Sequence, residues 1–165
     1  AYALTKAALD KKPEDTELLS ELALVCEKLK RFDEMEVLLR QLMLKEPQEA
    51  HAFNALGYSL ADRNTRLDEA RELIEKAVRL APQDAFIQDS LGWVLFRQGK
   101  HAEAATVLKA AYKIKPDAEI AAHLGEVLWA LGQTLEAGTI WREGLLLKAD
   151  NETLVETLQR FKFKP

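Results

Sequence analysis

The sequence is poor in the residues that cross-link chains, bind metal ions or hold phosphates. Among 165 residues there is one cysteine, Cys26, and there are three histidines, His51, His101 and His123. One cysteine cannot form an internal disulfide, so cysteine usage leaves the redox compartment open. Neither a His-x3-His or Cys-x2-Cys zinc spacing nor a GxGxxG or GK(S/T) phosphate loop occurs. We therefore expect no cofactor, no metal site and no enzymatic activity, and we expect Cys26 to be a buried thiol.

Long apolar runs and an excess of positive charge are also absent. The longest apolar stretches, such as LGWVLF at 91–96, are far shorter than the roughly 20 residues that a bilayer-spanning helix needs. The net charge of -4 gives no general attraction to a nucleic-acid backbone. We expect neither membrane insertion of this segment nor a nucleic-acid partner. A content of 48% apolar and 30% charged residues is typical of an ordered protein with a core.

Proline is scarce, but four of the five prolines recur at a nearly constant spacing. Pro13, Pro47, Pro82 and Pro116 are separated by 34, 35 and 34 residues. Proline ends a helix because it lacks a backbone N–H, clashes with the preceding turn and disfavours helical geometry at the residue before it. A period of 34 residues is the length of one helix–turn–helix unit that stacks on copies of itself. The spacing therefore predicts a repeat array.

Aligning the units on their prolines shows a second set of matching residues. Leu22, Leu56 and Leu91 lie nine residues after a proline, and each is followed by alanine or glycine. Alanine also recurs 12 and five residues before the prolines, as at Ala70 and Ala77. Two helices approach to about 8 to 10 Å only where the contacting side chains are short. We therefore predict paired helices and no strand, with helices at 2–11, 15–29, 32–45, 49–62, 67–80, 84–98, 101–114, 117–131, 134–147 and 151–161.

These residues resemble the tetratricopeptide repeat (TPR), whose pattern is W-x2-L-G-x2-Y, then A-x3-F, then P. The second unit matches with Phe53, Leu56, Gly57, Leu60, Ala70, Ile74 and Pro82, and the third with Gln88, Leu91, Gly92, Leu95, Ala104, Leu108 and Pro116. The fourth unit has Ala121, Leu124, Gly125, Leu128, Ala137 and Trp141, with Ala149 in place of the proline. The resemblance covers nearly the whole chain. It implies an all-α fold, a right-handed TPR superhelix (α-solenoid) of stacked antiparallel helix pairs.

The resemblance also implies a single TPR domain over residues 1–165 with about four full repeats. The expected units are the second helix of a truncated repeat at 1–15, repeats at 16–49, 50–84, 85–117 and 118–151, and a capping helix at 152–165. Ala1 and Ala8 lie 12 and five residues before Pro13, so we expect the chain to begin inside a unit. Such a half-unit leaves an apolar face on which a second copy can stack. A homodimer or an extended solenoid is therefore the alternative to partner binding.

In the TPR family the first helices of successive units line a concave face on which partners bind. Helical positions that the repeat pattern does not require place aromatic and charged residues on that face here. The candidate partner-binding residues are the anchors Tyr58, Phe86, Trp93, Phe96 and Trp129 and the polar residues Asn54, Asp62, Asp89, Arg97 and Glu126. Aromatic residues and arginine are enriched at binding hot spots. The alternative is that the rings pack between adjacent first helices, which we favour for Phe96 and Trp129. Trp141 is expected in the core.

The type of ligand follows from what this face lacks. One subset of the family binds the C-terminal carboxylates of chaperones through Lys, Arg and Asn. The equivalent places here hold Ser20, Leu24, Tyr58, Asp89 and Trp93, and none of these is a cation. We expect a protein partner that presents a largely apolar or mixed ligand, as an extended segment or an amphipathic helix.

The block 54–104, together with EIAAHLGEVLWALG at 119–132, also resembles the C-terminal repeats of proteobacterial outer-membrane TPR lipoproteins. That group includes the lipoprotein partner of a carboxyl-terminal processing protease. The resemblance implies a periplasmic adaptor, anchored to the outer membrane through a missing N-terminal region, that brings a protease to cell-wall enzymes. A cytoplasmic location is the alternative.

Overall fold

The computed structural model describes residues 1–165, and all of its regular structure is helical. The helices are α1 (Tyr2–Lys11), α2 (Thr16–Lys28), α3 (Phe32–Lys45), α4 (Ala50–Asp62), α5 (Leu67–Leu80), α6 (Ala85–Arg97), α7 (His101–Ile114), α8 (Ala118–Ala130), α9 (Thr134–Leu147) and α10 (Glu152–Arg160). Every predicted helix is present, and its ends agree with the prediction to within one residue. None of the helices combines the length and the apolarity that crossing a bilayer requires.

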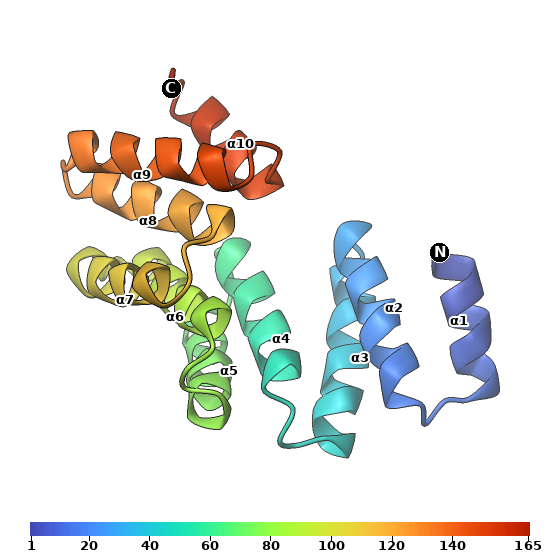
Figure 1. Cartoon of the computed structure of the whole chain (residues 1–165). Coiled ribbons are helices and arrows are strands. Elements are labelled where there is room, and N and C mark those ends of the chain that lie inside the picture. The colour runs from blue at the N-terminus through green and yellow to red at the C-terminus, as the bar shows by residue number, and fades with distance from the viewer.

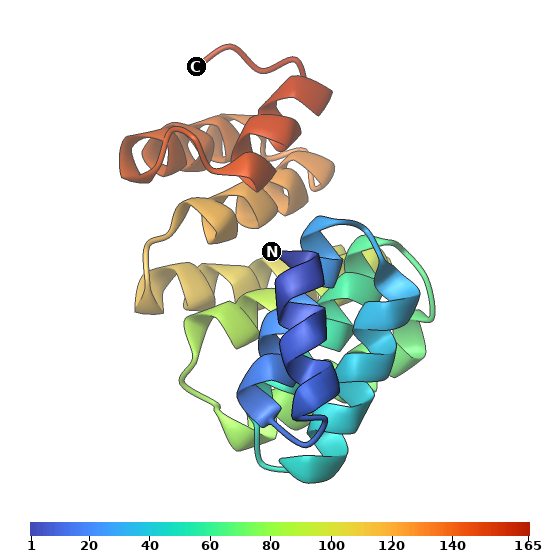
Figure 2. The ribbon, with the colours of Figure 1, turned by 90° about the vertical axis from the view of Figure 1, so that its right-hand side faces the viewer.

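The helices stack in antiparallel pairs along a curved path (Figure 1). The pairs are α2 with α3, α4 with α5, α6 with α7 and α8 with α9, while α1 and α10 pack at the two ends. The path runs from α1–α3 on the right of Figure 1 through α4 to α8–α10 at the upper left. Figure 2 looks at that right-hand side, with α1 in front and α8–α10 stacked above. The expected right-handed TPR superhelix of about four repeats is confirmed.

A polar residue begins each first helix and the last helix. Asp15, Glu49, Asp84, Asp117 and Asn151 precede α2, α4, α6, α8 and α10, and each side chain accepts a hydrogen bond from a backbone N–H of the first turn. Such caps satisfy N–H groups that have no partner within the helix. The fourth unit has therefore lost its proline to Ala149 but has kept a capped start for the helix that follows.

The same five helices end with a residue in the left-handed backbone conformation. These residues are Lys30, Asn64, Gly99, Gly132 and Lys162, with φ of 58, 53, 83, 80 and 51°. The next N–H donates to the carbonyl five residues back, as from Lys100 to Leu95 at 2.9 Å and from Phe163 to Leu158 at 3.0 Å. This is the Schellman motif, which satisfies the last carbonyls of a helix. Because α10 begins and ends as the first helices do, it occupies the place of a further first helix.

Close approach of the two helices in a unit depends on a small residue in the first helix. A Cβ on Gly57 would lie 2.6 Å from Cγ1 of Ile74 in the second helix. Likewise, a Cβ on Gly125 would overlap the indole of Trp141. Ile74 and Trp141 are both fully buried, as is Cys26. The predicted core positions of Trp141 and Cys26 are therefore confirmed.

Candidate functional site

A groove runs along the inner side of the curve, over the first helices and α10. Its wider part has a volume of about 700 Å³ and is lined mainly from α2, α4, the start of α8 and the turn between α9 and α10. Its narrower part has a volume of about 290 Å³ and is lined from α4, α6, α8 and α10. Tyr58, Asp62 and Thr153 line both parts, so the two are continuous. We call the two parts together the central groove.

At the floor of the central groove, three side chains from different first helices form a hydrogen-bonded network, in which Tyr58 and His123 line the groove and Asp89 lies beneath them. Both carboxylate oxygens of Asp89 lie 2.9 Å from Nδ1 of His123. On the other side of the ring, Nε2 of His123 lies 3.2 Å from the hydroxyl oxygen of Tyr58. Asp89 and His123 are only 3% and 1% exposed. The network joins α4, α6 and α8, and it therefore links three successive units.

Trp93 covers this network. Its ring stacks on the imidazole of His123 with centroids 4.3 Å apart, and its indole N–H donates to the Asp62 carboxylate at 3.2 Å. One turn further along α6, Arg97 donates to the backbone carbonyls of Ala61 and Asp62, each at 3.1 Å. These contacts hold the C-terminal half of α6 against the end of α4.

Burial and charge act in opposite directions on the two titrating groups. Burial alone lowers the pKa of His123, but the Asp89 carboxylate and its hydrogen bond raise that pKa to about 9, with help from Glu119 and Asp62. Burial raises the pKa of Asp89, while the charge of His123 opposes this. At neutral pH the imidazolium therefore donates from Nδ1 to Asp89 and from Nε2 to Tyr58. A charge this deeply buried requires such a partner.

A second charged pair closes the C-terminal end of the groove. Arg160 of α10 donates two hydrogen bonds to the carboxylate of Glu126 on α8, at 3.0 and 2.7 Å. Glu126 is 6% exposed. A bidentate contact between arginine and a carboxylate fixes orientation as well as distance. The pair therefore sets the position of α10 over the groove.

The structure divides the ten candidate residues by position. Tyr58, Asp62, Trp93, Arg97 and Glu126 line the central groove, and Asp89 lies beneath it. The other four, Asn54, Phe86, Phe96 and Trp129, lie outside the lining. The Phe86 ring lies under Nζ of Lys115 at 4.9 Å, Phe96 packs between Trp93 and His101, and Trp129 packs on Trp141 and Phe161.

The expectation of an aromatic surface along the groove is wrong. Trp93 is 3% exposed, and it packs between first helices as the alternative interpretation describes. Asp89 and Glu126 do not form an exposed rim, because a desolvated carboxylate needs a partner and each has one. Most of the lining is polar. Partner binding by the five residues that do line the groove stays a prediction.

The sequence analysis did not predict that α10 lines the central groove. Thr153, Thr157 and Arg160 of this helix line the narrower part of the groove. Leu154 and Leu158 repeat the four-residue spacing that Leu124 and Leu128 have in the fourth unit. That spacing is the signal that marks α10 as a further first helix with a face toward the groove.

Of the five carboxylates that line the wider part without a salt bridge, three lie on first helices. They are Glu27 of α2, Asp62 of α4 and Glu119 of α8. Burial raises the pKa of Glu27, and Asp62 and Glu119 raise it further against the opposing charge of Lys28. Burial and the same carboxylates raise the pKa of Tyr58 well above its usual value. These carboxylates therefore make the surroundings of Glu27 and Tyr58 electronegative, although Lys28, Lys30, Arg63 and Lys148 also line the wider part. No group of three or more His, Cys, Asp or Glu side chains is placed to hold a metal ion.

Comparison with known proteins gives one family match and one curated relative. A family model described as tetratricopeptide repeat matches residues 1–157. The TPR repeat-containing protein PA4667 of Pseudomonas aeruginosa is 48% identical over 117 residues, which are 71% of this chain and 20% of that protein. The chain therefore spans about a fifth of the length of that relative.

Solved structures share the fold at low sequence identity. The thermophilic TPR protein TTC0263 of Thermus thermophilus superposes with a TM-score of 0.84 at 22% identity, over 98% of this chain and 89% of that one. YrrB, described as a TPR protein with an unusual peptide-binding site, superposes with a TM-score of 0.66 at 17% identity, over 97% and 91% of the two chains. At these identities the likeness concerns the fold alone.

Proposed function

This chain belongs to the tetratricopeptide repeat family, and we propose that its central groove binds an extended segment of a partner protein. The observation that carries the proposal is the groove itself. It is continuous from α2 to α10 and is lined mainly by polar side chains. A groove of this kind suits a peptide backbone with alternating side chains. YrrB, which shares the fold, is described as having a peptide-binding site, and this supports a peptide as the ligand.

The groove acts as a scaffold in this proposal and carries out no chemistry. Its one histidine, His123, is stacked against Trp93 and paired with Asp89, so neither ring nitrogen faces the groove with a free lone pair. Cys26 is buried in the core, and burial raises the pKa of its thiol. A nucleophile requires an accessible group activated by a neighbouring base.

The resemblance to outer-membrane lipoproteins extends this proposal to a place in the cell. We propose that the natural full-length protein is a periplasmic adaptor and that its partner is a protease or a cell-wall enzyme. The identity of 48% with PA4667 of Pseudomonas aeruginosa supports a bacterial protein. Fractionation of cells that express the full-length protein tests the location, and recovery in the cytosol alone contradicts it.

Charge reversal inside the groove tests the binding proposal. The variant Asp62→Arg/Glu156→Arg changes two groove side chains, and a random twelve-residue peptide library displayed on phage provides the ligands. We expect enriched peptides to bind the unchanged chain and to lose at least tenfold in affinity for the variant, measured by fluorescence polarisation. The matched control Glu72→Arg/Glu103→Arg makes the same charge change at exposed positions of α5 and α7 and should bind normally.

Two results contradict the proposal, provided that circular dichroism shows both variants to be folded. One is a library that yields no enriched peptide, and the other is equal binding by the groove variant and its control. The alternative of self-association is favoured by exposed leucines on the second helices, since Leu4, Leu44, Leu135 and Leu146 are 78 to 89% exposed. Light scattering over a concentration series decides for that alternative if the apparent mass rises while no peptide binds.

A further inference from the structure

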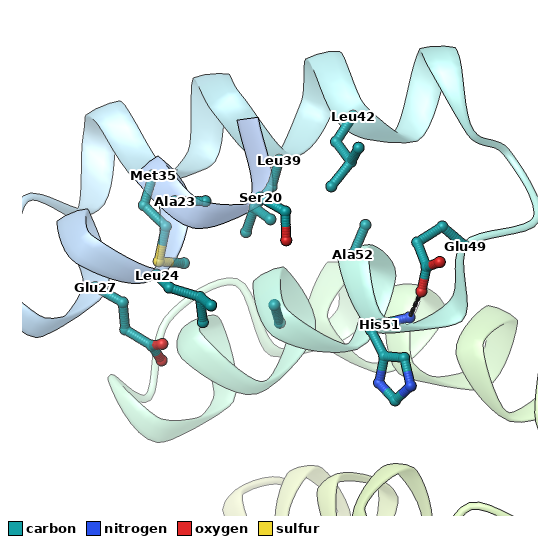
Figure 3. Close-up of a pocket in the computed structure, with 11 residues that line it drawn as sticks. Ser20, Ala23, Leu24, Glu27, Met35, Leu39, Leu42, Glu49, His51 and Ala52 are labelled. Atoms are coloured by element: carbon teal, nitrogen blue, oxygen red, sulfur yellow. Dashed lines mark hydrogen bonds between the residues drawn. The ribbon is translucent and has the colours of Figure 1, made fainter. Parts of the chain in front are cut away.

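An apolar cleft opens between α2 and α4, next to the central groove. It has a volume of about 180 Å³ and is lined by seven hydrophobic residues among eleven. Figure 3 shows Leu24 and Ala23 entering from α2, Leu39 and Leu42 from α3, and Ala52 from α4. We call this space the α2/α4 cleft. It is large enough for the aliphatic side chain of a ligand.

The cleft exists because α4 carries small residues where α6 carries large ones. Ala52 and Ser59 occupy the positions that Ile87 and Val94 hold one unit later. On α6 those two side chains are fully buried and fill the space toward α4. As a result α4 packs closely on α6, whereas α2 and α4 make at most marginal contact. The contact between α2 and α4 therefore lacks the large side chains that fill the contact between α4 and α6.

Leu24 forms the open side of the cleft. It occupies the position that Tyr58 and Trp93 hold in the next two units. Those two rings pack against His123, but no such partner reaches Leu24, which is 54% exposed. An apolar side chain placed against Leu24 would remove its surface from water, which is favourable in proportion to the area covered.

Glu27 connects the cleft to the central groove, because its side chain lines both. It stands at the position of Ala61, which is fully buried in the following unit. The carboxylate is thus partly desolvated without a salt bridge, and it shares the middle of the groove with Asp62 and Glu119. A cation from a ligand would neutralise a charge that the chain itself leaves unpaired.

We propose that the α2/α4 cleft and these three carboxylates together recognise one partner segment, an extended peptide with an aliphatic side chain followed closely by lysine or arginine. The aliphatic side chain fills the cleft against Leu24 and Ala52. The cation lies in the groove among Glu27, Asp62 and Glu119. This inference rests on the proposed binding of a partner segment in the central groove, and it adds where the segment is anchored and which side chains it presents.

The test uses the phage-displayed peptides of the previous subsection and two variants of the whole chain. Ala52→Ile copies Ile87 and fills the cleft, while Glu27→Gln removes the charge at its mouth. We expect enriched peptides to carry Leu, Ile, Val or Met within three residues of Lys or Arg. Ala52→Ile should weaken their binding at least tenfold. Glu27→Gln should weaken it at least threefold and reduce its dependence on salt.

Matched controls change the same residue types elsewhere. Ala110→Ile lies on the exposed side of α7 and Glu17→Gln on the exposed side of α2, and both should bind as the unchanged chain does. Leu24→Asn is a second cleft variant at a half-exposed position, which keeps the test valid if Ala52→Ile is misfolded. It should also lose at least tenfold.

The binding results distinguish the cleft inference from the proposed function of the groove. Peptides without the aliphatic and basic pair, or equal affinities for the cleft variants and their controls, overturn the cleft inference. If Asp62→Arg/Glu156→Arg still abolishes binding in that case, the groove function stands without it. A library that yields no peptide overturns both.

Discussion

Replacing Trp141 with alanine is expected to lower the free energy of unfolding by about 3 to 5 kcal/mol, the range for removing a large buried aromatic side chain. The indole is fully buried. Its ring centroid lies 5.5 Å from that of Trp129, 5.4 Å from Phe161 and 5.2 Å from Phe163. It also fills the space that Gly125 leaves open. Urea unfolding followed by circular dichroism measures the loss.

The effect should be local, because each unit of a solenoid contacts only its neighbours. Amide hydrogen exchange should quicken in α8–α10 and stay unchanged in α2–α5. Leu135→Ala, on the same helix at an 89% exposed position, should cost less than about 0.5 kcal/mol. Trp141→Leu copies the pair of Gly92 with Leu108 and should fall between the two. A loss for Trp141→Ala no larger than that for Leu135→Ala would show that the indole does not hold the C-terminal units together.

The helices could be predicted from the sequence because their ends are set by local chemistry that recurs along the array. A proline stops one helix, a polar cap one or two residues later starts the next, and a left-handed residue ends it. These signals act within a few residues, so they can be read without knowing the tertiary structure. Even Lys30 and Asn64, which are not glycine, take the left-handed conformation that Gly99 takes in its unit.

The buried network could not be predicted in the same way, since its members do not occupy equivalent positions. When the units are aligned, Tyr58 matches Trp93, whereas His123 matches Ser90. The alignment therefore gives no sign that Tyr58 and His123 belong to one network. The Tyr58 and His123 contact also joins residues 65 positions apart and passes over a whole unit. Only the twist of the superhelix brings α4 and α8 close enough, and that twist is a property of the assembled array.

The predicted aromatic groove failed for a related physical reason. Helical periodicity identifies the side of α6 that points away from the core of its own unit, and Trp93 does lie on that side. Periodicity does not say whether a neighbouring unit covers that side. Here α8 supplies His123 beneath the indole, and the end of α4 supplies Asp62 at its N–H. The surface left to a ligand is therefore made by polar residues that the repeat pattern leaves free, including those of α10.

Raising the pH from 6.5 to 9 is expected to remove about 3 kcal/mol of stability that the His123 and Asp89 pair supplies at lower pH. The pKa of His123 is about 9 in the folded chain, against 6.5 for an ordinary imidazole. Between these values the folded state holds a proton that the unfolded chain releases, so stability falls as the pH rises. The contribution is fully present below pH 6.5 and is lost as the pH passes 9.

Comparison with His123→Gln isolates this contribution in urea unfolding at several pH values. Cys26, whose pKa burial raises, is present in both proteins, so its effect cancels in the difference. The variant should lose most relative to the unchanged chain below pH 6.5 and least above pH 9. Tyr58→Phe keeps the ion pair and loses one hydrogen bond, so it should cost about 1 kcal/mol with an unchanged pH dependence. Parallel pH profiles for the unchanged chain and His123→Gln would mean that the buried imidazole is neutral and that the network is held by neutral hydrogen bonds instead.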